Sequence, residues 1–385
     1  MKKIIIGGAG VFGATCARIL AEAGFLVEIY EKEKQVGGLL YDYLPNDFNF
    51  FVHKYGPHIL NIDDESVYDF LNRFDTYINL DIKRKVLVRG KKIPLPINLE
   101  SIRFMLSEEE YNKIIPKLLR FFCTKEVSIK QLLDAGIPEV EQLGKMIMET
   151  VYLGYNLKMW NLKPDEVNVD VLNRMPIRLS DDNKLTKCKY QLIPSKGYTH
   201  LIEVLLNHCN IKLFRETNFL DNYHIKDGKV IKDEQEITDI VVFSGAIDEL
   251  FGFEYGELSY RAIEFKKNLR DVNIDNEAAV ITYPNNYKKT RSTDMQMLSG
   301  KSGGKTIIVS EYPGVYCRNN KLYGRPSYPV GKKSDLEIFK LYWEKVKQIP
   351  NLYVGGRLGE YKYYDMQATI LSAMNVAEKI IADNI

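Results

Sequence analysis

Three glycines near the N-terminus, Gly8, Gly10 and Gly13, have the spacing of a turn that binds the phosphates of a dinucleotide. The first glycine of such a turn makes the tight bend, the second lets a pyrophosphate approach the backbone, and the third lets a helix pack closely on the preceding strand. The N-terminus of that helix supplies free N–H groups and a positive dipole end for the phosphates. Glu31 lies where a carboxylate would bind the adenosine ribose hydroxyls. These residues predict a dinucleotide site.

The residues around the glycines have the apolar patterns that position such a turn. Residues 3–7 and 26–30 are short apolar runs typical of strands buried on both faces, and residues 14–23 have apolar side chains at helical spacing. A lone glycine motif is often only a turn, but here strand, turn, helix, second strand and acid agree. We therefore predict an α/β chain with a Rossmann-like domain.

A second glycine pair, Gly37 and Gly38, follows Glu31 closely. NAD-binding domains have no need of this pair, and no second complete glycine motif occurs later in the sequence. The pair is similar to that of the flavoprotein family that includes glutathione reductase and the amine oxidases, in which it lies along the FAD. This resemblance implies that the cofactor is FAD and not NAD.

Composition limits the possible partners and compartments. The 385 residues carry a net charge of only +2, so neither a nucleic acid nor a membrane is an expected partner. The five cysteines are odd in number and contain no Cys-x-x-Cys pair, which favours a reducing compartment and argues against a bound metal. No stretch is long and apolar enough to span a bilayer. We expect a cytoplasmic protein.

Changes of pattern along the chain predict its domains. Residues 100–154 have helical patterns, with Ser107 and Ser128 where N-caps are expected, and apolar runs at 261–267, 278–282 and 306–312 predict antiparallel strands. A last helix is expected at residues 367–383, after the glycine pair 355–356. We expect an FAD-binding domain of residues 1–80, 232–260 and 350–385, a helical lobe of residues 99–165, and an antiparallel sheet domain for the substrate of residues 81–98, 166–231 and 261–333.

An ordered series of motifs is similar to the UDP-galactopyranose mutase family over nearly the whole chain. They lie at residues 8–13, 37–38, 54–59, 154–160, 174–178, 190–194, 245–248, 260–261, 290–291, 328–330 and 356–366. The last motif is highly specific, and agreement of all of them by chance is negligible.

The resemblance implies a flavin that acts as a nucleophile without net redox change. In the family, N5 of the reduced flavin attacks the anomeric carbon and expels the nucleoside diphosphate. The sugar–flavin adduct then opens and recloses through another hydroxyl, so that a hexopyranose becomes a hexofuranose for cell-surface polysaccharide synthesis. The implied partner is a nucleoside-diphosphate sugar, and because bacterial members are often dimers, a homodimer is expected.

The resemblance also implies roles for individual residues. Arg178 and Arg291 are expected to clamp the diphosphate, because guanidinium groups suit phosphate. The expected catalytic residues are these two arginines and His58. The expected substrate-binding residues are Tyr155 at the base, Trp160 by the sugar, Tyr328, Tyr361 and Tyr364 at the phosphates, and Asn156, Tyr190 and Thr282. The expected cofactor-binding residues are Gly8, Gly10, Phe12, Gly13, Glu31, Lys32, Gly38, Leu39, His58, Ile59, Arg357, Asp365 and Met366.

Several positions depart from the family pattern on the sugar side. Asn61 replaces a histidine, Asn156 a threonine and Leu185 a tyrosine, while Ile82 and Thr282 replace asparagines. The nucleotide sugar is therefore left open between UDP-galactose, the first choice, and dTDP-fucose, UDP-N-acetylgalactosamine or a GDP-heptose. Two other classes remain as alternatives: an FAD-dependent oxidoreductase of amine-oxidase type, and a non-catalytic nucleotide-sugar binder.

Overall fold

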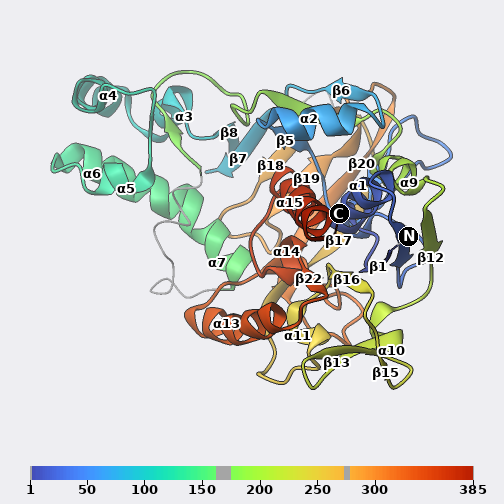
Figure 1. Ribbon diagram of the computed structural model, residues 1–385. Helices are drawn as coiled ribbons and strands as arrows, with labels where there is room; N and C mark the ends of the chain where they lie inside the picture. Colours follow the sequence, from blue (N-terminus) through green and yellow to red (C-terminus); the bar gives the residue numbers. More distant parts are fainter. Residues whose placement is uncertain (1, 162–174, 273–277, 385) are drawn as a thin grey trace. The chain divides into compact units, whose positions relative to one another are not determined.

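The computed structural model describes residues 2–161, 175–272 and 278–384 (Figure 1). The described residues form two compact units. The first unit contains Met1–Asn79, Cys188–Ala262 and Tyr316–Ile385, and the second contains Leu80–Lys187 and Ile263–Val315. None of the helices within the described ranges is long and apolar enough to cross a membrane.

The first unit is built on a parallel sheet with the strand order β12-β2-β1-β16-β22. These strands are β1 (Lys3–Gly7), β2 (Leu26–Tyr30), β12 (Ile211–Phe214), β16 (Ile240–Phe243) and β22 (Leu352–Val354). Their continuous apolar runs suit a sheet that is covered on both faces. The helices α1 (Val11–Glu22) and α15 (Met366–Asn384) pack against each other beside this sheet (Figure 1). The predicted strand, glycine turn, helix and second strand are confirmed.

Smaller elements complete the first unit. The strands β5 (Leu60–Ile62) and β6 (Tyr77–Asn79) flank β11 (Tyr190–Pro194), and β3 (Asp42–Tyr43) pairs with β4 (Val52–His53). The other elements are α2 (Glu65–Asn72), α9 (Tyr198–Leu206), α10 (Phe219–Asn222), β13 (Tyr223–Lys226), β14 (Lys229–Lys232), β15 (Gln235–Glu236), α11 (Ile247–Leu250), β21 (Tyr328–Pro329), α13 (Lys333–Gln348) and α14 (Gly356–Gly359).

Two segments of the predicted substrate domain, residues 188–231 and 316–333, belong instead to the first unit. In the first segment, β12 pairs in parallel with β2 and β11 pairs with β5 and β6. In the second segment, Tyr328 and Pro329 pair with Arg261 and Tyr260. The apolar run of β12 is short, and its sequence alone does not identify its partner strand.

The second unit combines a sheet with a group of helices. The strand order is β17-β20-β19-β18-β7-β8, in which β17 (Tyr260–Asp271) belongs to this unit from Ile263 onward. The other strands are β20 (Lys305–Val315), β19 (Arg291–Asp294), β18 (Val280–Thr282), β7 (Arg84–Val88) and β8 (Lys91–Leu95). The prediction of antiparallel pairing fails at one place, because β18 runs parallel to β7.

The helices of the second unit are α3 (Leu99–Met105), α4 (Glu108–Phe122), α5 (Ile129–Leu133), α6 (Pro138–Ile147), a π-helix (Met148–Leu153), α7 (Gly154–Trp160) and α12 (Met295–Leu298), and a two-stranded pair joins β9 (Glu126–Val127) to β10 (Ile177–Arg178). Ser107 and Ser128 form capping boxes, as predicted. The helices share one core with the β7–β8 hairpin, in which Val86 and Leu95 pack with Leu118 and Val140. The expected helical lobe therefore has no core of its own.

Candidate functional site

The glycine turn has the backbone that its residue types require. Gly8 has φ +103°, a conformation that favours glycine. A Cβ on Gly13 would lie 2.0 Å from the carbonyl oxygen of Gly8, so only glycine fits there. Gly10 is different, because its φ of −79° suits any residue and a Cβ there would meet nothing within 4 Å. The space beside Gly10 is therefore open, as close approach of a pyrophosphate requires.

The second glycine pair lies against the first motif. Gly37 forms a parallel bridge with Gly10, and its N–H donates to the carbonyl of Ala9 at 2.9 Å. A Cβ on Gly38 would lie 3.4 Å from the Cα of Gly10. Gly37 and Gly38 have φ values of +101° and +55°. The two predicted glycine motifs thus form one continuous backbone surface, which suits an extended dinucleotide.

Glu31 has a structural contact that the sequence did not predict. Its side chain is 5% exposed, and its two oxygens accept the N–H groups of Ala9 and Glu33, each at 2.9 Å. A carboxylate has lone pairs for further donors, so this geometry leaves room for ribose hydroxyls. Glu31 therefore ties the glycine turn to β2, and its role at the ribose remains a prediction. Lys32 is exposed, and Leu39 is half-buried in the short helix Gly38–Leu40.

The ring of Phe12 packs directly against the backbone of the glycine pair 355–356. A Cβ on Gly355 would lie 2.2 Å from Cζ of Phe12, and one on Gly356 would lie 3.2 Å from its Cγ. The glycines were expected to allow close approach of a ligand, but what they approach is the buried ring of Phe12. Phe12 thereby fixes the start of α14, which precedes the motif at 357–366.

That motif is held by its own polar side chains. Arg357 donates from Nε and Nη2 to the carbonyl of Tyr364 at 2.9 and 2.5 Å, and from Nη1 to that of Ser327 at 3.1 Å. Asp365 accepts the N–H of Ala368 at 2.8 Å, just before Met366 begins α15. Arg357 and Asp365 shape this loop, and their predicted roles at the flavin remain predictions.

The tyrosines of the motif do not all fit the predicted role at the phosphates. Tyr361 is buried, and its hydroxyl donates to the carbonyl of Ser259 at 2.6 Å and to Asp335 at 3.0 Å. The hydroxyl of Tyr364 donates to Glu360 at 2.6 Å. Burial raises the pKa of both tyrosines. The assignment of Tyr361 to phosphate binding is therefore corrected, because its hydroxyl is engaged inside the first unit.

Tyr363 is a candidate that the sequence prediction missed. It is exposed, and its ring stacks on Tyr328 with 5.3 Å between the ring centroids. The guanidinium of Arg357 lies 4.8 Å from the centroid of Tyr328, which further fixes this pair. Residues two apart in a regular extended segment would face the same side, but Tyr361 has φ +48°, which breaks the extended backbone at this point. The sequence does not tell which of the two tyrosines is buried. Tyr190 is another predicted substrate residue of this unit, and its ring stacks on that of Tyr68 with 3.7 Å between the ring centroids.

Three residues that were not predicted brace the backbone of His58. His53 is buried and accepts the N–H of His58 on Nδ1 at 2.9 Å, while Tyr198 donates its hydroxyl to the carbonyl of His58 at 3.1 Å. Asp42 accepts the N–H groups of Tyr198 and Thr199 at 2.7 and 2.9 Å, which fixes the start of α9. The peptide before Ile59, in the predicted flavin site, is therefore held from both sides.

His53 must be neutral to serve as this acceptor. Its Nδ1 accepts a hydrogen bond, so its proton is on Nε2. Burial lowers the pKa of His53 to about 4, from an ordinary value of 6.5. The unfolded state therefore binds a proton between pH 6.5 and 4 that the folded state does not, and stability is lost as the pH falls through this window.

Replacing His53 with asparagine is expected to remove this loss of stability. The Oδ1 of asparagine can accept the same N–H but does not titrate. Between pH 7 and pH 4.5, the wild type should lose about 2–3 kcal/mol more unfolding free energy than His53→Asn, measured by urea denaturation.

The difference between the two proteins isolates His53. Burial raises the pKa of Asp248 to about 6, so this carboxyl contributes with the opposite sign in the same window, but equally in both proteins. Parallel pH profiles for wild type and His53→Asn would contradict the neutral buried histidine.

In the second unit, Arg291 and Thr282 lie side by side. They are directly opposite each other on β19 and β18, and Arg291 also faces Glu311 on β20. Arg291 donates from Nε and Nη2 to one oxygen of Glu311 at 2.9 and 2.7 Å. Among the described residues, the hydroxyl of Thr282 and the other oxygen of Glu311 are buried without a hydrogen-bond partner. Such groups are costly unless a ligand or water satisfies them.

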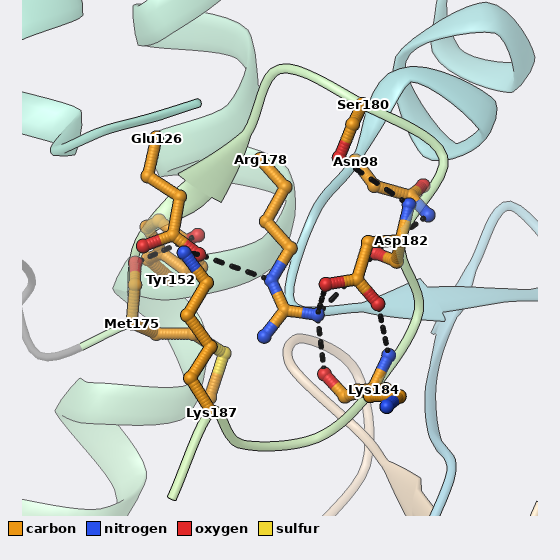
Figure 2. A network of polar contacts seen from close by, with 9 residues as sticks. All are labelled: Asn98, Glu126, Tyr152, Met175, Arg178, Ser180, Asp182, Lys184 and Lys187. Atoms are coloured by element: carbon orange, nitrogen blue, oxygen red, sulfur yellow. Dashed lines mark hydrogen bonds and ion pairs between the residues drawn. The ribbon is translucent and has the colours of Figure 1, made fainter. Parts of the chain in front are cut away.

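Figure 2 shows that Arg178 lies inside a polar network. It is 2% exposed and donates from Nε to Glu126 at 3.2 Å and from Nη1 to the carbonyl of Lys184 at 2.5 Å. Nη1 also lies 3.1 Å from a carboxylate oxygen of Asp182, and Lys187 contacts Glu126 at 2.8 Å. The remaining guanidinium nitrogen points away from these partners (Figure 2). Arg178 thus holds the segment that follows β10. Arg174, at the start of the same motif, lies outside the described residues.

The predicted residues for the base and the sugar share one short helix. Tyr155, Asn156 and Trp160 are half-buried on α7, and Asn156 donates to the carbonyl of Tyr152 at 2.9 Å. The π-helix Met148–Leu153 comes directly before α7. Wide turns of this kind occur frequently at functional sites. In the part of the chain that the structure describes, the residues predicted to bind the flavin belong to the first unit, whereas Arg178, Arg291, Thr282 and the α7 residues belong to the second.

Comparisons with known proteins give the family. A family model described as UDP-galactopyranose mutase matches residues 150–363, and one described as an NAD(P)-binding Rossmann-like domain matches residues 5–74. The chain is 31% identical to dTDP-fucopyranose mutase of Escherichia coli, covering 100% of both chains. It is 28% identical to UDP-galactopyranose mutase of Mycoplasma pneumoniae, covering 98% of this chain and 96% of that one.

Solved structures show the same fold. A crystal structure of reduced UDP-galactopyranose mutase matches with a TM-score of 0.71 at 14% identity, covering 99% of this chain and 94% of that one. A triple mutant of putrescine oxidase matches with a TM-score of 0.57 at 11% identity, covering 100% of this chain and 99% of that one. At such identities the likeness concerns the fold alone, so the oxidase match does not favour the oxidoreductase alternative. The family model and the relatives carry the assignment: this chain belongs to the UDP-galactopyranose mutase family, a family of isomerases.

Proposed function

We propose that the protein interconverts the pyranose and furanose forms of a nucleoside-diphosphate hexose, with FAD as its cofactor. The observation that carries this proposal is the group on β18–β20, where Thr282, whose hydroxyl is buried without a hydrogen-bond partner among the described residues, is directly opposite Arg291. A ligand that carries both anionic phosphates and sugar hydroxyls would satisfy such a pair. The guanidinium fork suits the diphosphate, and a hydroxyl suits the sugar.

The residues of the first unit fit a dinucleotide. The open space at Gly10 suits the pyrophosphate, Glu31 has lone pairs for the ribose, and the braced peptide at His58 offers a fixed edge for the ring system. When bound and reduced, the flavin would supply the nucleophile for the anomeric carbon. The chain's own residues would hold the diphosphate as it leaves and returns. We assign this role to Tyr363, which stacks on Tyr328, and no longer to Tyr361.

The sugar is proposed to be galactose, with 6-deoxygalactose (fucose) as the second candidate. By their names, the Escherichia coli relative acts on dTDP-fucopyranose and the Mycoplasma pneumoniae relative on UDP-galactopyranose. Ile82 is buried at the edge of β7 and gives the sugar no hydrogen-bond partner, which favours a less polar sugar. The family resemblance further supports a homodimer that makes precursors of cell-surface polysaccharides in the cytoplasm. All five cysteines lie in the described residues, and none of them forms a disulfide, which suits a reducing compartment.

The test is a product assay with four nucleotide sugars. Protein reduced with dithionite would be incubated with UDP-galactose, dTDP-fucose, UDP-N-acetylgalactosamine and a GDP-heptose, and products separated by chromatography. We expect furanose product from UDP-galactose or dTDP-fucose, and none from oxidised protein.

The outcomes separate the alternatives. Equal turnover with oxidised flavin, or purified protein without flavin, would contradict the proposed cofactor. Intact reduced flavin without turnover of any of the four sugars would contradict the mutase proposal, and binding of a sugar without turnover would favour the non-catalytic binder. The highest kcat/KM for dTDP-fucose would show that the apolar side chain of Ile82 predicts the sugar better than the name of the family does.

A further inference from the structure

A single lysine of α7 is surrounded by backbone carbonyls of another segment. Nζ of Lys158 lies within hydrogen-bond distance of four carbonyl oxygens, which its three N–H groups share: Tyr283 at 2.6 Å, Tyr287 at 2.8 Å, and Asn285 and Lys289 at 3.2 Å. All of these carbonyls belong to residues 283–289, which connect β18 to β19. Burial lowers the pKa of Lys158 to about 8, so the ammonium remains the main form at neutral pH.

Two further contacts hold the same connection against the helices. A Cβ on Gly154 would lie 2.0 Å from the side-chain oxygen of Asn285 and 2.7 Å from the carbonyl oxygen of Pro284, so α7 begins in direct contact with the connection. The side-chain amide of Asn285 donates to the carbonyls of Glu149 and Thr150 at 3.4 and 3.2 Å. Thr150 belongs to the π-helix, whose wide turn leaves carbonyls available for such donors. The contact is therefore built from both sides.

The connection and the helix carry different halves of the proposed substrate site. The connection lies between Thr282, the last residue of β18, and Arg291, the first residue of β19, whereas α7 carries Tyr155 and Trp160. The ammonium of Lys158 fixes α7 relative to the connection, because its hydrogen bonds to carbonyls are stronger than neutral ones and the carbonyls converge on one point. The contacts of Gly154 and Asn285 act together with it.

We propose that Lys158 is a positioning residue for the nucleotide sugar, which joins α7 to the connection 283–289 and so aligns the base- and sugar-binding side chains with the diphosphate-binding arginine. This inference rests on the proposed function. It assigns Lys158 a role in substrate affinity, through other residues and without contact to the reacting atoms.

The first test is Lys158→Met, which keeps the apolar stem and removes the charge. We expect a KM for the nucleotide sugar at least about tenfold higher, with kcat changed by less than about threefold, because alignment for binding is lost while the reacting groups remain. The dissociation constant of UDP or dTDP, whichever binds the wild type more tightly, should rise by a similar factor in calorimetry. Flavin content and visible spectrum should not change. Lys113→Met is the control, since Lys113 is exposed in the same unit and pairs only at the surface with Glu139.

Chemical rescue separates positioning from a general loss of structure. Carbonyl oxygens that converge on one point also bind monovalent cations. In Lys158→Ala, added ammonium or methylamine should therefore lower KM again, with no such effect on the wild type. Asn285→Ala removes the other side of the contact and should also raise KM, even if the lysine variants fold poorly.

The outcomes are distinct. Wild-type KM and diphosphate affinity in folded Lys158→Met would overturn the inference, as would a loss of kcat at unchanged KM. Failure of both lysine variants to fold, together with wild-type KM in Asn285→Ala, would overturn it too. A wild-type protein that binds neither diphosphate and converts no sugar would instead defeat the proposed function itself.

Discussion

Replacing Arg291 with alanine is expected to lower kcat/KM for the nucleotide sugar by at least about tenfold. A hydrogen bond from a guanidinium to a phosphate contributes about 1.5–3 kcal/mol, and part of it would develop as the diphosphate becomes a leaving group. Arg291→Lys should recover only part of the loss, because an ammonium keeps the charge but lacks the planar fork. Steady-state kinetics with reduced enzyme measures both effects.

The salt bridge to Glu311 requires a matched control for this prediction. Glu311 is 1% exposed, so Arg291→Ala leaves a buried carboxylate without its partner and should destabilise the second unit. The double variant Arg291→Ala with Glu311→Gln should regain thermal stability but not activity. If the double variant regains activity as well, the loss in the single variant was structural, and the diphosphate role would be withdrawn.

Arg178→Ala is expected to lose activity by a similar factor, with a larger structural effect. The guanidinium holds Glu126, Asp182 and the carbonyl of Lys184, and all three would lose a partner. Limited proteolysis of residues 178–187 would report a loosened segment, and flavin content should stay unchanged. Near-wild-type kcat/KM for both arginine variants would refute the clamp.

Two alanine substitutions in the glycine turn are expected to differ sharply. In Gly13→Ala the new methyl would collide with the backbone of Gly8, so the variant should fold poorly and lose its flavin. In Gly10→Ala the methyl meets no protein atom and the backbone suits alanine, so the protein should fold normally. The methyl would fill the space beside Gly10, and FAD affinity should fall by at least about tenfold, which corresponds to about 1.4 kcal/mol.

Thermal unfolding of flavin-free protein and titration with FAD distinguish the two variants. Gly10→Ala should match the unfolding temperature of flavin-free wild type while binding FAD weakly. Wild-type FAD affinity in Gly10→Ala would show that the pyrophosphate does not approach this glycine, and the flavin site would need another location.

The sequence predicted the local parts of this molecule well. The strand, glycine turn and helix of residues 3–22 follow from neighbouring residues, and Ser107 and Ser128 cap helices through contacts three residues away. Pairing over long distances was less predictable. The pairing of β12 with β2 and the parallel pairing of β18 with β7 depend on tertiary packing that short apolar runs do not specify.

Side-chain partners explain most of what was missed at the candidate site. Arg178 was expected to clamp the diphosphate, and its contact with Glu126, 52 positions away, could not be predicted from the sequence. Tyr361 and Tyr363 are alike in sequence, and only packing shows that the first is buried. His53 was visible as a histidine, yet its role depends on the N–H of His58, whose direction no sequence pattern gives. Motif similarity finds positions, whereas hydrogen-bond partners require the fold.

The interleaved strand order of the first unit has a consequence for protein synthesis. Ile4 pairs with Ile240, Val241 pairs with Leu352, and the thiol of Cys16 donates to the carbonyl of Ala373, 357 positions later. The glycine turn therefore leaves the ribosome long before the strands and helix that enclose it. Until then the apolar strand of residues 3–7 lacks its partner on one side and is exposed to aggregation and proteolysis. Cofactor loading should be a post-translational event, and interrupted translation should yield fragments that cannot retain flavin.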